Sequence, residues 1–146
     1  MTTTLEDTTL VLTRTFAAAP EDVFDAWMER EAWQSWIGPE GVSCEALLLE
    51  PRVGGRYRIE MRMSDGRLVP VGGVFRAIER PAGFVFTWCW ENDPDRESLI
   101  TITLKPVAAG TELTLRQEGL GTIENRDDHG KGWGSALNKL ERYLAR

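Results

Sequence analysis

Residues 54–68 read GGRYRIEMRMSDGRL, and this stretch decides the fold of the chain. From Tyr57 to Met63 every second residue is apolar and the residues between them are charged, which is typical of a strand with one buried face. The turn that follows contains Gly66, which readily adopts the positive φ of a hairpin turn. The stretch therefore predicts an antiparallel hairpin whose apolar face must be covered by another element.

Similar alternation marks strands on both sides of this hairpin. The pair Gly72-Gly73 implies an edge, a bulge or a sharp bend in the return strand, and the next strand carries Trp88 and Trp90 on its apolar face. Because short turns join successive strands, we predict an antiparallel meander of about seven strands. The predicted strands are residues 10–16, 42–49, 56–63, 68–79, 84–91, 98–105 and 111–118.

Two short helices are predicted directly after the first strand. Pro20 suits the first turn of a helix that ends near Met28, with acidic residues near its positive end. A second helix runs from about Arg30 to Trp36, where a Gly-Pro pair ends it.

The last predicted element is a long helix that Asn125 or Asp127 could cap. Its inward residues recur at spacings of three and four and are His129, Trp133, Ala136, Leu137, Leu140 and Leu144. Gly130, Gly132 and Gly134 each weaken the helix by roughly 1 kcal/mol relative to Ala, which indicates close approach by a strand or a ligand. Because this helix is the only sizeable element that can cover the sheet, we predict an α+β fold in which a curved antiparallel sheet wraps the helix around an apolar cavity.

The length and composition of the chain indicate one domain over residues 1–146, and we expect residues 1–9 to form a mobile N-terminal tail. A formal net charge of -6 disfavours nucleic acid and anionic membrane surfaces as partners. The N-terminus lacks the features of a secretion signal, and no apolar run approaches the roughly 20 residues of a membrane span. We therefore predict a cytoplasmic protein that binds neither nucleic acid nor membrane.

The order of elements resembles the helix-grip fold of the START and polyketide-cyclase (SRPBCC) superfamily. The residues are similar to its Aha-type branch, named for activators of a heat-shock chaperone's ATPase, from Leu10 to Leu144. The matching motifs are FAAAPEDVFDAW (16–27), WQSWIGP (33–39), GGRY (54–57), GVF (73–75), FTW (86–88) and HGKGW (129–133), followed by Leu137, Leu140 and Tyr143-Leu144. The superfamily includes lipid carriers, hormone receptors, cyclases and chaperone activators, so the resemblance implies a cavity, and with the chaperone branch a link to stress responses, rather than one chemistry.

The expected cavity takes its walls from aromatic and flexible apolar side chains, which would enclose a small hydrophobic or aromatic ligand. The same side chains could equally form an ordinary core. Tyr57, Gln117 and His129 would add polar contacts that orient the ligand, and no cofactor is predicted. The candidate ligand-binding residues are Trp36, Tyr57, Met61, Met63, Phe75, Phe86, Trp88, Trp90, Gln117, His129, Trp133 and Leu137.

His129 is the only histidine of the chain. As a general base it would need a carboxylate or a nucleophile within about 3 Å, and the alternative is a polar residue at the cavity mouth. Cys44 and Cys89 have the spacing of neither a metal knuckle nor a disulfide framework, and a metal site needs three or four converging ligands. We therefore predict no metal site and name no catalytic residue.

Three functions remain open from the sequence. The first is a binding module for a small hydrophobic molecule. The second is a chaperone co-factor or a protein-interaction domain, including a homodimer; the alternating Arg56, Arg58 and Arg62 form either a solvated outer face or a docking surface for an acidic partner. The third is a cyclase- or hydrolase-like enzyme. The resemblance implies a further N-terminal domain in chaperone activators, for which we expect no room in 146 residues, and this favours the binding module.

Overall fold

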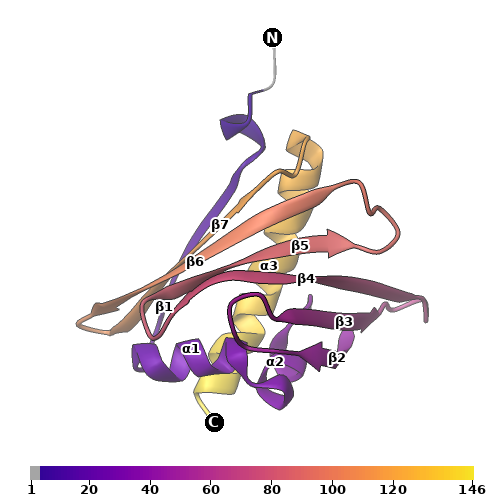
Figure 1. Cartoon of the computed structure of the whole chain (residues 1–146). Coiled ribbons are helices and arrows are strands. Elements are labelled where there is room, and N and C mark those ends of the chain that lie inside the picture. Colours follow the sequence, from indigo (N-terminus) through magenta and orange to yellow (C-terminus); the bar gives the residue numbers. More distant parts are fainter. Residues whose placement is uncertain (1–3) are drawn as a thin grey trace.

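The computed structural model describes residues 4–146 and contains a seven-stranded antiparallel sheet in the order β1-β7-β6-β5-β4-β3-β2 (Figure 1). The strands are β1 (Leu10–Phe16), β2 (Ser43–Leu49), β3 (Arg56–Arg62), β4 (Leu68–Glu79), β5 (Gly83–Trp90), β6 (Glu97–Val107) and β7 (Gly110–Glu118). The sheet curves around the long C-terminal helix α3 (Ile123–Leu144). The α+β helix-grip fold predicted from the sequence is confirmed.

At the glycine pair of the return strand β4, where we predict an edge, a bulge or a sharp bend, β4 and β5 approach each other closely. A Cβ atom at Gly73 would lie 2.0 Å from the carbonyl oxygen of Thr87, so only glycine fits at this point. The pairing register of β4 and β5 then shifts between Phe75 and Ala77. Such an irregularity increases the local twist of the sheet, which helps it to curve around α3.

The helices also follow the predicted order. Helices α1 (Pro20–Met28) and α2 (Arg30–Trp36) lie near the C-terminal end of α3 (Figure 1). The cap of α3 differs from the prediction, because Thr122 precedes the helix and its hydroxyl accepts a hydrogen bond of 3.0 Å from the backbone N–H of Asn125. A hydroxyl at this position satisfies an amide that has no partner within the helix.

Part of the segment that we predict to be a mobile tail, residues 4–9, has contacts with the rest of the fold. Glu6–Thr8 form a short 3-10 helix, η1, in which Thr8 is buried. Arg126 of α3 donates a hydrogen bond of 2.6 Å to the backbone oxygen of Asp7, which ties this segment to the helix. Residues 1–3 lie outside the described residues.

The main core lies between the sheet, the two short helices and the second half of α3. Trp27, Trp33 and Trp36 are fully buried there, and Trp88 and Trp133, which are 3% and 4% exposed, belong to the same core cluster. Between residues 4 and 146, no helix combines the length and the apolar character needed to cross a membrane.

Candidate functional site

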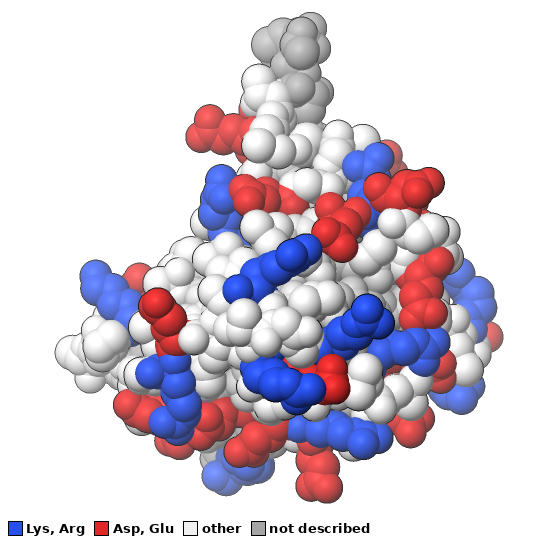
Figure 2. All heavy atoms as spheres, viewed as in Figure 1, with Lys and Arg blue, Asp and Glu red and all other residues white. Residues whose placement is uncertain are grey.

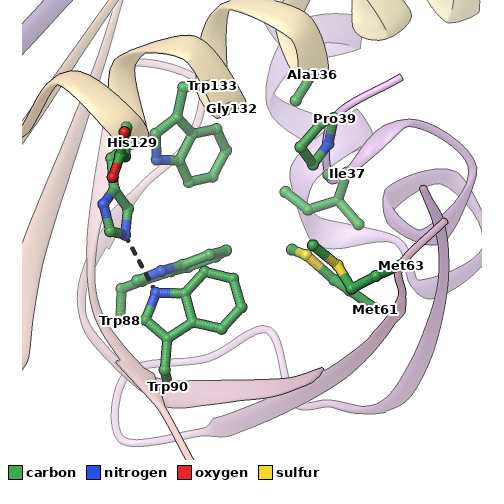
Figure 3. Close-up of a pocket in the computed structure, with 12 residues that line it drawn as sticks. Ile37, Pro39, Met61, Met63, Trp88, Trp90, His129, Gly132, Trp133 and Ala136 are labelled. Carbon is green, nitrogen blue, oxygen red and sulfur yellow. Dashed lines mark hydrogen bonds between the residues drawn. The ribbon is translucent and has the colours of Figure 1, made fainter. Parts of the chain in front are cut away.

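A cavity of about 240 Å³ lies between α3, the ends of β3 and β5, and the loop that follows α2 (Figure 3). Its wall is almost entirely apolar, and Asp128 and His129 are the titratable side chains in it. The lining residues are Ile37, Gly38, Pro39, Met61, Met63, Trp88, Trp90, Asp128, His129, Gly132, Trp133 and Ala136. An apolar cavity with few polar groups is the usual form of a site for a small hydrophobic molecule.

Strands β3 and β5 reach the cavity from the same side because they run in the same direction. Each pairs antiparallel with β4, so their C-terminal ends lie next to each other. Met61 at the end of β3 and Met63 just after it therefore converge with Trp88 and Trp90 at the end of β5. The earlier inward residues of both strands lie in the core instead.

Helix α3 contributes one face, on which His129, Gly132, Trp133 and Ala136 follow each other at spacings of three and four. The two small residues leave the space that a larger side chain would fill. A Cβ atom at Gly132 would have the Cγ of Pro39, at 3.8 Å, as its only neighbour within 4 Å. A side chain at this position would therefore extend into the cavity without a clash at its base.

The third wall is the loop 37–42, which α3 holds in place. The Nζ atom of Lys139 donates hydrogen bonds to three backbone carbonyls of this loop, at 3.2, 3.2 and 3.4 Å. The hydroxyl of Ser135 accepts a bond of 2.7 Å from the backbone N–H of Glu40, and the Glu40 side chain pairs with Arg142. These contacts stabilise a loop that has no regular secondary structure of its own.

Both ring nitrogens of His129 are engaged within the protein. Nε2 accepts a hydrogen bond of 3.1 Å from the indole N–H of Trp90, shown as the dashed line in Figure 3. The proton must therefore be on Nδ1, which lies 2.9 Å from the backbone oxygen of Asn125 and donates to it. Burial lowers the pKa of His129, against the raising effects of the Asn125 bond and the charge of Asp128, so the neutral form is favoured. A histidine held in this way links α3 to β5. This agrees with a polar residue at the cavity mouth, which we considered as the alternative to a general base.

A second chain of hydrogen bonds fixes the ring of Trp133. Its indole N–H donates to Gln117 at 2.9 Å, and Gln117 donates to the hydroxyl of Ser98 at 2.8 Å. The ring then packs between Trp27 and Trp88, with centroid distances of 5.8 and 5.1 Å. Trp133 is therefore a rigid part of the cavity wall.

The structure brings part of the predicted ligand-binding set into the cavity wall and places the rest in the packed core. The residues on the wall are Met61, Met63, Trp88, Trp90, His129 and Trp133. The residues in the core, away from the wall, are Trp36, Tyr57, Phe75, Phe86, Gln117 and Leu137.

Packing and internal hydrogen bonds explain the residues that lie in the core. Trp36 is 0% exposed and donates a bond of 2.9 Å to the backbone oxygen of Ala26. Gln117 holds Trp133, and Leu137 lies one position beyond the cavity-facing Ala136, so it turns toward the core.

The remaining three form one aromatic cluster. Tyr57, Phe75 and Phe86 have ring centroids 5.7 to 6.0 Å apart, and the hydroxyl of Tyr57 donates to the backbone oxygen of Thr87. Because this hydroxyl already has an acceptor, it does not face the cavity as a free polar group.

The wall also contains residues that the sequence prediction missed, and these are Ile37, Gly38, Pro39, Asp128, Gly132 and Ala136. The sequence does place Ala136 on the inward face of the helix and indicates close approach by a strand or a ligand at Gly132, but the predicted ligand-binding set includes neither residue. No sequence pattern indicated that the loop after Trp36 closes the cavity, because Lys139, which holds it, is far away in the chain.

The cavity and its surroundings offer little reactive chemistry. Burial raises the pKa of the Cys44 thiol to about 11, with a smaller opposing effect of Lys139, so this thiol is protonated at neutral pH. Within the part of the chain that the structure describes, no group of three or more His, Cys, Asp or Glu side chains could hold a metal ion. The site is therefore best described by its shape and its apolar wall.

Some of the charged residues on the sheet form ion pairs. Arg58 of the arginine row donates to Glu91 at 2.6 Å and lies 3.8 Å from Glu60. Figure 2 shows Lys and Arg interspersed with Asp and Glu on the visible face, without a large region of one sign. A surface with mixed charges does not steer an acidic partner electrostatically toward this face.

Comparisons with known proteins agree with this architecture. A family model described as "Activator of Hsp90 ATPase homolog 1-like protein" matches residues 17–145. A crystal structure of a Chromobacterium violaceum protein is 28% identical, covers 94% of this chain and 98% of its own, and superimposes with a TM-score of 0.88. The AHSA1 protein from Silicibacter pomeroyi is 33% identical, with coverages of 94% and 97% and a TM-score of 0.83. A Rhodobacter sphaeroides protein is 28% identical, with coverages of 95% and 93% and a TM-score of 0.82. No curated protein sequence gives a significant match.

Proposed function

The chain belongs to the Activator of Hsp90 ATPase homolog 1-like family, and we propose that it acts as a binding module that encloses a small hydrophobic or aromatic molecule. The observation that carries this proposal is the apolar cavity between α3 and the ends of β3 and β5. Members of this fold commonly bind hydrophobic ligands or act as co-chaperones. The cavity favours the first of these activities.

The size of the cavity limits its ligand. An engineered apolar cavity of about 150 Å³ in another protein stays dry and binds benzene. At about 240 Å³, the present cavity suits a molecule with one or two rings or a short acyl chain. The rings of Trp88 and Trp133, 5.1 Å apart, offer flat apolar surfaces for such a molecule.

Substitution of Gly132 by Leu tests the proposal. The new side chain would begin 3.8 Å from Pro39 and occupy the cavity, while Leu is a better helix former than Gly. We expect Gly132→Leu to fold, to unfold at the same or a higher temperature, and to lose about 10-fold or more of its affinity for naphthalene derivatives. Quenching of tryptophan fluorescence measures the affinity, since three tryptophans line the cavity.

The matched control is Gly134→Leu on the same helix. A Cβ atom at Gly134 meets nothing within 4 Å, and Gly134 does not line the cavity. This variant should gain the same helix propensity and keep the affinity of the native protein. If Gly132→Leu bound as tightly as Gly134→Leu, the ligand would not occupy this cavity and the proposal would fail.

The family supports a second candidate function, a co-chaperone, because its description names an activator of the Hsp90 ATPase. Adding the protein to the Hsp90-type chaperone of its own host and measuring ATP hydrolysis tests this candidate. A rate that rises with protein concentration, and that rises equally with Gly132→Leu, would support a co-chaperone that does not use the cavity. An unchanged rate would remove this candidate and leave the binding module.

A further inference from the structure

A second cavity of about 310 Å³ adjoins the apolar cavity and is more polar. The two cavities share four wall residues, Met63, Trp88, Trp90 and His129. The hydrogen bond from Trp90 to His129 therefore lies in the partition between them. The apolar cavity alone falls below the range of about 300–1,000 Å³ that is usual for ligand sites, whereas the two together fall within it.

The partition contains more hydrogen-bond donors than acceptors. The indole N–H of Trp90 donates to Nε2 of His129, but the indole N–H of Trp88 has no partner although Trp88 is only 3% exposed. The two indoles lie next to each other, with ring centroids 5.5 Å apart and the rings nearly perpendicular (Figure 3). An indole can only donate, and a buried donor without an acceptor is costly. The wall therefore lacks an acceptor.

The position of Trp88 distinguishes it from the other tryptophans whose indole N–H has no acceptor. Among residues 4–146, two further buried indole N–H groups have no partner, those of Trp27 and Trp33. Both belong to the packed core and line neither of the two cavities. Trp88 is the one that lines both cavities, and because its nitrogen is itself buried, its ring must turn toward the partition for a bound molecule to supply the missing acceptor.

The second cavity adds positive charge on its side of the partition. Arg67, Arg96 and one carboxylate, Asp93, line it, and Arg67 already pairs with Asp65 at 2.7 Å, so Arg96 is the cation to consider. Arg96 is held in place, since its Nη1 donates a bond of 3.2 Å to the backbone oxygen of Leu120, and a Cβ at Gly121 would lie 1.7 Å from the same nitrogen. Its Nε lies 3.8 Å from the carboxylate of Asp93, which is a long ion pair, and 46% of the side chain is exposed. The guanidinium can therefore still bind an anion.

We propose that the ligand is an aryl or short-chain carboxylate, whose apolar body lies in the apolar cavity and whose carboxylate lies at the shared partition. There the two carboxylate oxygens accept hydrogen bonds from the indole N–H groups of Trp88 and Trp90, on the side that Arg96 lines. Trp90 exchanges its acceptor, His129, for the ligand. This inference rests on the proposed function and adds the chemical class of the ligand.

The chemistry of the partition favours a carboxylate over other end groups. A carboxylate accepts several hydrogen bonds and donates none, so it matches a partition in which two indole donors have only one acceptor, which Trp90 occupies. At the partition an ammonium group would meet two N–H groups and the Arg96 guanidinium, while the two carboxylates, Asp93 and Asp128, lie elsewhere on the walls. A plain hydrocarbon would leave Trp88 without a partner. Both should bind less tightly than the carboxylate.

The test compares 2-naphthoate with 2-methylnaphthalene, which has nearly the same shape but no acceptor, on the native protein and on Trp88→Phe. We expect the native protein to bind 2-naphthoate about 10-fold more tightly than 2-methylnaphthalene. In Trp88→Phe, the affinity for 2-naphthoate should fall about 5- to 10-fold, whereas the affinity for 2-methylnaphthalene should fall less than about 2-fold. The loss of affinity for the hydrocarbon measures any general damage to the cavity. The ratio of the two losses therefore measures the contribution of the indole N–H.

An NMR measurement on the native protein needs no variant that might fold poorly. On adding 2-naphthoate, the indole ¹H resonance of Trp88, assigned through its NOEs to the neighbouring rings of Trp90 and Trp133, should move downfield as expected for a new hydrogen bond, while 2-methylnaphthalene should not move it in that direction. Equal affinities for the two compounds, with equal losses in Trp88→Phe, would overturn the carboxylate inference and leave the binding module intact. Failure of both compounds to bind would overturn both.

Discussion

His129 shows how one residue can link a helix to a strand through the position of a single proton. Its Nε2 accepts from Trp90 and its Nδ1 donates to Asn125, so protonation of Nε2 would place two N–H groups against each other. Burial lowers its pKa, which means that the folded state favours the neutral ring. The link should therefore weaken in acid.

This arrangement predicts a pH dependence of the free energy of unfolding. The unfolded chain binds a proton at His129 with a pKa of about 6.5, whereas the folded chain resists protonation until a lower pH. Stability should be constant above neutral pH and fall by at most about 1.4 kcal/mol per pH unit as the pH decreases from about 7 to 5.5. His129→Gln keeps an acceptor but does not titrate, so its stability in urea unfolding should stay flat over this interval. Parallel curves for the two proteins would contradict this account of His129.

Two glycines should respond to alanine in opposite ways. Gly73→Ala would place Cβ 2.0 Å from a backbone oxygen, and we expect a loss of about 2 kcal/mol or more. Gly134→Ala has open space and should gain about 0.5–1 kcal/mol from helix propensity. Urea unfolding of both variants measures these changes. A tolerated Gly73→Ala would show that β4 and β5 do not approach each other as described.

At the scale of elements, α3 both covers the sheet and holds the loop that closes the cavity. Ser135, Lys139 and Arg142 lie on successive turns and bind the loop 37–42 through its carbonyls, the N–H of Glu40 and the Glu40 side chain. The loop provides Ile37, Gly38 and Pro39 to the wall. The cavity therefore depends on contacts between parts of the chain about a hundred residues apart.

Substitution of Lys139 by Met tests this dependence. Met keeps most of the apolar stem but removes the donors of three carbonyls, so we expect a loss of about 1–3 kcal/mol. Hydrogen exchange of amides in residues 37–42 should become faster, and ligand affinity should fall because one wall loosens. Lys131→Met, at an exposed position of the same helix, is the control and should change neither quantity. Unchanged exchange in Lys139→Met would show that the loop is held by other contacts.

The elements could be predicted from the sequence because each carries its own periodicity. The alternation from Tyr57 to Met63 and the spacing from His129 to Leu140 fix strand and helix faces locally. The division of an apolar face between core and cavity could not be predicted in this way. Phe86 and Trp88 have the same periodicity, and only the position of each along β5 relative to α3 separates the core residue from the wall residue.

At the scale of the whole molecule, the aromatic residues divide into two groups with different roles. Trp27, Trp33 and Trp36 lie only in the core beneath the short helices, whereas the tryptophans of β5 and α3 also line a space that side chains leave empty. The sheet, α3 and the loop 37–42 each provide one wall of that space. The central claim is therefore that this fold keeps an apolar cavity open for a ligand.

The most direct test of this claim is a crystal structure determined under xenon pressure. Xenon occupies apolar cavities and needs no knowledge of the natural ligand. We predict a xenon site enclosed by Met61, Trp88 and Trp133, with these side chains in the positions described here. A structure in which the side chains of Met63 or Trp90 fill this space and no xenon binds there would contradict the account.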